Sequence, residues 1–92
     1  MHQSYLEVTF RNGMPLAAYY YLPRKSDDKC SRVEKHGTGL LVDLTADGRP
    51  LGIEITVPAS VTVDSLNEVL EFYGLHPIDS DELAPLTPKR AA

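Results

Sequence analysis

The segment from Leu40 to Ile55 constrains the fold most, because its sequence, LLVDLTADGRPLGIEI, predicts a β-hairpin with a defined register. Asp47-Gly48 is typical of a two-residue type I′ turn, in which both central residues take positive φ. Folding the chain there pairs apolar residues across the turn: Leu44 with Leu51, Val42 with Ile53, and Leu40 with Ile55. Because side chains alternate between the faces of a strand, all six share one face. The opposite face carries Leu41, Asp43, Gly52 and Glu54.

Three further stretches have the pattern of strands: residues 5–10, residues 16–22 and the short run 32–36. In LAAYYYL, residues 16–22, one face carries Leu16, Ala18, Tyr20 and Leu22, and the other carries Ala17, Tyr19 and Tyr21. Neither face is polar enough to lie in water unaided. This strand is therefore either covered on both sides or part of a contact with another chain.

One amphipathic helix follows these strands. Thr62 is placed to be its N-cap, and Gly74 is placed to end it in a Schellman motif with Leu75. An apolar stripe at helical spacing runs between them, made of Leu66, Val69, Leu70 and Tyr73. Residues 77–92 contain three prolines and show no periodicity, which is typical of a flexible tail.

The sequence therefore predicts an α+β fold. We expect one domain over residues 1–76, followed by the proline-containing flexible C-terminal tail 77–92. Its sheet is small, mostly antiparallel and meander-like, with four to five strands, and one C-terminal helix packs on one face.

Composition excludes several classes of function. The chain has 92 residues and carries 13 acidic against 9 basic residues, a net charge of −4, and the basic residues are scattered. This argues against a nucleic-acid ligand. No run approaches the ~18 apolar residues of a membrane span. Cys30 is the single cysteine, so we expect no internal disulfide and a cytoplasmic protein.

Residues 12–60 resemble the bacterial domain of unknown function 2283. The segments that carry the resemblance are Ala17–Leu22, Leu41–Asp43, Asp47-Gly48, Gly52-Ile53-Glu54-Ile55 and Ala59-Ser60. The resemblance covers about half of the chain, and the family's aspartate at the head of the tyrosine strand falls on Leu16 here. It implies a compact β-sheet followed by a helix, suggests a small toxin-like partner, and implies no activity.

Two groups of residues are candidate sites. Asp43 and Glu54 lie diagonally on one sheet face, where two carboxylates can form an acid–base pair or bind a ligand; the alternative is a solvated, charged face. Tyr19, Tyr21 and Phe72 are candidates for an interface, because tyrosine combines apolar area with a polar tip. Alternatively, Tyr19 and Tyr21 pack under the tail or under residues 32–36.

The leading hypothesis for function is a non-catalytic interaction module that forms a homodimer and is a partner or neutraliser of a small basic protein. The alternative is a small-molecule or metal-binding protein that uses the carboxylates on the sheet face. The sequence predicts no enzyme, because no nucleophile–base pair and no phosphate loop occurs in it, and it predicts no cofactor and no metal site.

Overall fold

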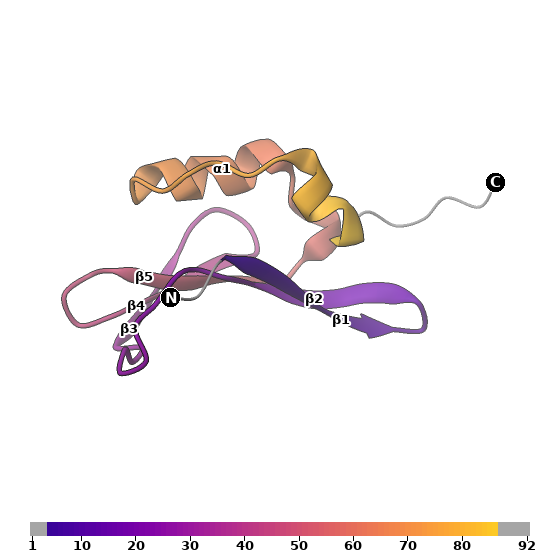
Figure 1. The fold of residues 1–92 in the computed structure, drawn as a ribbon. Coiled ribbons are helices and arrows are strands. Elements are labelled where there is room, and N and C mark those ends of the chain that lie inside the picture. The colour runs from indigo at the N-terminus through magenta and orange to yellow at the C-terminus, as the bar shows by residue number, and fades with distance from the viewer. Residues whose placement is uncertain (1–3, 87–92) are drawn as a thin grey trace.

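The computed structural model describes residues 4–86 and shows an α+β fold: an open five-stranded antiparallel sheet with one α-helix across it (Figure 1). The strands are β1 (Tyr5–Arg11), β2 (Met14–Tyr21), β3 (Arg32–Lys35), β4 (Leu40–Leu44) and β5 (Pro50–Ile55). The helices are the 3₁₀ segment η1 (Pro58–Ser60), α1 (Val63–Phe72) and the 3₁₀ segment η2 (Ser80–Leu86). Across residues 4–86, no helix has both the length and the apolar character that a membrane crossing needs.

The strand order is β1-β2-β5-β4-β3. Two antiparallel units, β1–β2 and β3–β4–β5, are joined in the middle because β2 pairs with β5. The tyrosine-rich strand β2 is therefore an inner strand. Its partners on the two sides are β1 and β5.

The predicted register of the β4–β5 hairpin is confirmed for two of its three pairs. Leu40 lies opposite Ile55 and Val42 lies opposite Ile53. The third pair is wrong, because a register shift after Asp43 places Leu44 opposite Pro50 instead of Leu51.

The turn of this hairpin also differs from the prediction. Gly48 has φ of 89°, whereas Asp47 is not in the positive-φ region. The Gly48 N–H donates to the Thr45 carbonyl at 3.0 Å, and the Thr45 N–H donates to the Arg49 carbonyl at 2.9 Å. The loop is therefore the three-residue kind, in which one glycine takes the left-handed position and the type I′ geometry is not needed.

The type I′ signature occurs in the first hairpin instead. Asn12 and Gly13 have φ of 54° and 77°, and they connect Arg11 to its partner Met14. A register shift after Thr9 leaves Leu16 as an extra residue on β2, and Leu16 is 52% exposed. Leu16 was predicted to share a face with Ala18 and Tyr20, and the bulge at this point explains why it stays outside the core.

The apolar face of the sheet packs against α1 as predicted. Leu66, Val69 and Leu70 are buried, together with Val42, Ile53 and the other inward residues of β4 and β5. Thr62 is the N-cap, and its hydroxyl and the Ser65 backbone and side chain form a reciprocal capping box. At the other end, the Gly74 and Leu75 N–H groups donate to the Glu71 and Leu70 carbonyls, which is the predicted Schellman motif.

The predicted tail is wrong for residues 77–86. Ile78, Leu83 and Leu86 are at most 6% exposed and belong to the same core, and η2 contacts β1 and β2. Figure 1 shows this segment returning along α1. Five strands span about 19 Å, whereas one helix is about 10 Å wide, so one helix leaves part of the apolar face uncovered. Residues 77–86 cover that part. The last six predicted tail residues, 87–92, lie outside the described residues.

Candidate functional site

The sheet face opposite α1 carries an aromatic cluster, which we call the tyrosine face: Tyr5, Tyr19 and Tyr21 with the carboxylates of Glu7, Asp43 and Glu54. Tyr5 lies opposite Tyr21 in the β1–β2 ladder, and their rings stack with centroids 4.5 Å apart. The Tyr19 and Tyr21 rings are 4.6 Å apart and tilted by 55°. Tyr20, between them, points to the core and is 5% exposed. Because residues 77–86 pack on the core side, they do not cover Tyr19 or Tyr21.

Tyr19 crosses two strands because Gly52 leaves room for its ring. Gly52 is buried, and a Cβ atom there would overlap the Tyr19 ring and hydroxyl. The Tyr19 hydroxyl donates a hydrogen bond of 2.6 Å to Asp43 Oδ2, two strands away. Gly52 thus permits a close approach on this face, and the Tyr19 ring occupies that position.

Both half-buried tyrosines of this face are held neutral. Burial raises the pKa of Tyr19, and the Asp43 carboxylate raises it further because a phenolate would repel it. The pKa of Tyr21 is also raised, by burial and then by the neighbouring Glu7. These phenols therefore act as hydrogen-bond donors and aromatic surfaces near neutral pH, rather than as bases or nucleophiles.

Arg24 shows that the tyrosine face accepts a cation. Its guanidinium carbon lies 5.6 Å from the centroid of the Tyr21 ring, within the range of a cation–π contact. Arg24 is held there by a hydrogen bond of 3.1 Å from Nη2 to the Leu51 carbonyl. One guanidinium of this chain thus already lies against the cluster.

Asp43 and Glu54 lie where the sequence places them. Asp43 is opposite Gly52 and Glu54 is opposite Leu41, so the two carboxylates are diagonal neighbours on the same face. Asp43 accepts the bond from Tyr19, and Glu54 is exposed beside a hollow of about 170 Å³ that Glu7 and Tyr19 also line. Within residues 4–86, no hydrogen bond joins the two carboxylates, and no group of three or more His, Cys, Asp or Glu side chains is placed to hold a metal ion.

Phe72 is not part of the tyrosine face. It lies on α1, is 70% exposed, and packs edge-on against His36 and Tyr73, with ring centroids 5.1 and 5.0 Å away. Phe72 therefore lies on a separate surface, beside a groove of about 370 Å³ between α1 and the residues around Gly37. Its role in an interface remains a prediction.

A polar relay beside Phe72 was missed by the sequence analysis. The Tyr73 hydroxyl donates to Glu34 Oε1 at 2.6 Å and lies 2.7 Å from His36 Nε2. Burial and then the Glu34 carboxylate raise the pKa of Tyr73, whereas the bond from Tyr73 lowers the pKa of Glu34. The three residues come from β3, the loop after it and the end of α1, so only the tertiary fold brings them together.

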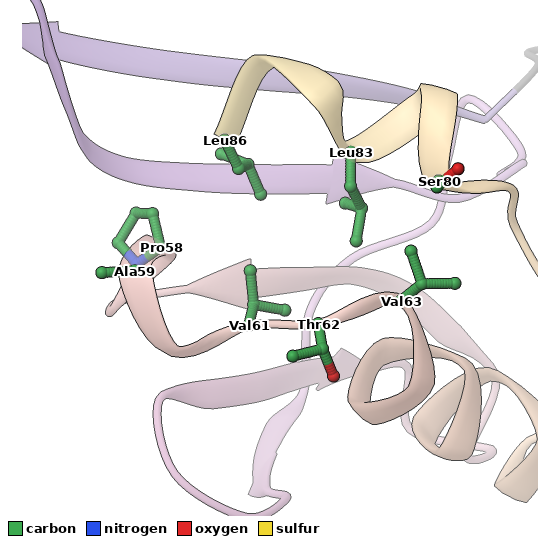
Figure 2. A pocket seen from close by; sticks show the side chains of 8 residues that line it. All are labelled: Pro58, Ala59, Val61, Thr62, Val63, Ser80, Leu83 and Leu86. Carbon is green, nitrogen blue, oxygen red and sulfur yellow. The ribbon is translucent and has the colours of Figure 1, made fainter. Parts of the chain in front are cut away.

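A second groove, of about 270 Å³, lies between η2 and the segment leading into α1 (Figure 2). Leu83 and Leu86 project from one side, and Val61 and Pro58 face them from the other. The described residues that line this groove are apolar apart from Thr62 and Ser80, so they offer mainly apolar contact. It was missed because residues 77–86 were predicted to be a tail.

Comparison with known proteins found no matching family model, no matching curated protein and no matching solved structure. The resemblance to the domain of unknown function 2283 therefore remains a prediction from the residues quoted above.

Proposed function

We propose that this chain is a non-catalytic interaction module that binds a small basic protein through its tyrosine face. One observation carries the proposal: within residues 4–86, a stacked tyrosine cluster lies on the sheet face opposite α1 and η2, where Arg24 contacts Tyr21 and Tyr5 stays 53% exposed. Tyrosine is enriched at interface hot spots because it contributes a large, rigid apolar area and a polar tip.

Charge favours a basic partner. The tyrosine face combines its aromatic rings with three carboxylates, those of Glu7, Asp43 and Glu54, and the whole chain has a net charge of −4. Arg24 against Tyr21 is an internal example of the contact that arginine or lysine side chains of a partner would make with Tyr5, which is 53% exposed. Complementary charge also speeds association.

We further propose that the module is a homodimer and acts in a reducing cytoplasm. Tyr5 lies on an edge strand, so a second copy beside that edge would extend the tyrosine face. The single cysteine, Cys30, is exposed, and a reducing compartment keeps such a thiol free.

The test uses a hepta-arginine peptide as a probe of basic side chains, with binding measured by calorimetry and mapped by NMR. Wild-type chain is expected to bind the peptide with shift changes at Tyr19, Tyr21 and Glu54. Tyr5→Ala and Glu54→Gln are each expected to weaken binding about fivefold, since an exposed cation–π contact or ion pair contributes up to about 1 kcal/mol.

Glu71→Gln is the matched control, because Glu71 is an exposed carboxylate on α1 with the same charge change. It is expected to leave the affinity of the probe almost unchanged. Shift changes centred on α1, equal losses in the Glu71 variant, or no binding at millimolar peptide would overturn the proposal.

A further inference from the structure

The two edges of the sheet differ in how well they are protected. β1 and β3 are the edge strands, and within residues 4–86 neither has a strand partner on its outer side. β3 has only four residues, and Arg32 and Lys35 lie at its ends. β1 has seven residues, YLEVTFR, without proline or lysine. Short strands, lysine, proline and bulges are the usual protection of an edge, so β1 is the edge open to pairing.

β1 is also regular along its length. The extra residue at the register shift in the β1–β2 ladder is Leu16, which belongs to β2, so β1 itself carries no bulge. Phe10 is 54% exposed on this strand. Arg11 is exposed, and the ion pairs of residues 4–86 do not include it. The outer half of β1 therefore has an aromatic ring and a cation without a partner in the described chain.

We propose that β1 pairs antiparallel with β1 of a second copy, about a two-fold axis at Thr9, and that this forms one continuous sheet. The inference deepens the dimer part of the proposed function by naming its surface. It does not depend on whether the tyrosine face binds a basic protein.

Charge selects this register. Residues that lie directly opposite each other share a face, so a two-fold antiparallel pair is centred on one residue of each strand. Centring on Glu7 or on Arg11 places two like charges opposite each other. Centring on Thr9 places Glu7 opposite Arg11 of the second copy, and this happens twice because of the symmetry.

The other pairs of that register are favourable as well. Phe10 lies opposite Val8 of the second copy, also twice, and the two Thr9 residues meet at the axis. Opposite charges, aromatic with β-branched residues, and threonine with threonine are all stabilising cross-strand pairs. Centring on Val8 would instead place Glu7 opposite Thr9, so Glu7 would face no opposite charge.

Cysteine cross-linking tests the edge and the register together. Thr9→Cys in a Cys30→Ser background is expected to form a disulfide-linked dimer on mild oxidation, because Cα atoms directly opposite are about 4.5–5.5 Å apart, within disulfide range. Val33→Cys in the same background is the control, since Val33 is 53% exposed on β3, the other edge. Cross-linking through Val33→Cys, or none through Thr9→Cys, overturns the proposal.

Charge reversal tests the Glu7–Arg11 pairs in solution by sedimentation equilibrium. The wild-type chain is expected to dimerise. Glu7→Arg alone and Arg11→Glu alone each create two like-charge pairs and are expected to weaken dimerisation about tenfold or more, because two attractive pairs become repulsive.

The double variant E7R/R11E restores opposite charges and is expected to recover most of the wild-type dimerisation. A monomer at the highest soluble concentration, or a double variant no better than the single ones, overturns the inference. A monomeric chain that still binds the hepta-arginine peptide would overturn the dimer alone, whereas a cross-linking dimer without peptide binding would overturn the basic-partner proposal alone.

Discussion

Replacing Gly52 with alanine tests the central contact of the tyrosine face. The added Cβ would overlap the Tyr19 ring and hydroxyl, so the ring would have to move away from β5. The moved ring would lose the hydrogen bond to Asp43 and its contact with Tyr21. Backbone strain does not contribute, because Gly52 is not among the glycines with positive φ.

The expected cost follows from these losses. A hydrogen bond to a charged group contributes about 1.5–3 kcal/mol and an aromatic pair about 0.5–1.5 kcal/mol, and both fall toward the lower end because Tyr19 is only half-buried. Alanine in a strand offsets about 0.5–1 kcal/mol of this, since it reduces the freedom of the unfolded chain. Gly52→Ala is therefore expected to lower the free energy of unfolding by about 1–3 kcal/mol.

A double-mutant cycle in urea, followed by far-ultraviolet circular dichroism, measures the coupling between the two positions. In a Tyr19→Ala background the ring is absent, so Gly52→Ala is expected to be neutral or stabilising by up to about 1 kcal/mol. The same loss of stability in both backgrounds would refute the reasoning, because the cost would then not come from the ring.

Three further predictions concern the parts that hold the fold together. Leu83→Ala is expected to lower the free energy of unfolding by about 2–5 kcal/mol in urea titrations, because Leu83 is 6% exposed. Pro85→Ala, on the exposed side of η2, is expected to have little effect, and equal effects of the two variants would contradict the packing of residues 77–86. Thr62→Ala is expected to cost about 0.5–2 kcal/mol in the same assay, because it removes the N-cap bond of α1, and an unchanged midpoint would contradict that role. Two hydrogen bonds from Arg49 lower the pKa of Asp28 to about 2, so Arg49→Ala is expected to return this pKa toward 3.8 in a carboxyl NMR titration. The wild type, unlike the variant, is expected to lose the stability that this ion pair contributes as the pH falls from about 4 through 2. An unchanged Asp28 pKa in the variant would contradict the ion pair.

The local elements were predictable because their causes are local. The alternation of apolar and polar residues in 40–55 places Val42 and Ile53 on the face of the sheet that is buried in the core. The N-cap at Thr62 and the Schellman motif at Gly74 need only a few neighbouring residues, and both were found as expected. The common face of Tyr19 and Tyr21 follows from the same period-2 geometry.

Two kinds of feature were not predictable in this way: a turn whose short sequence suits several geometries, and contacts that join distant segments. The turn at Gly48 follows a three-residue geometry because Thr45 bonds to both Asp47 and Arg49, and several turn types suit the same short sequence. The relay of Glu34, His36 and Tyr73 combines residues up to 39 positions apart, and no motif spacing marks it.

The sequence by itself thus determined the strands, the helix with its caps, and the inward or outward direction of most side chains, because these depend on backbone geometry over a few residues. Only the tertiary structure decided that β2 pairs with β5, that Tyr19 crosses Gly52 to reach Asp43, and that residues 77–86 join the core. The physical reason is that a five-stranded sheet has more apolar surface than one helix covers, and which segment covers the remainder depends on the whole chain, not on that segment's own periodicity.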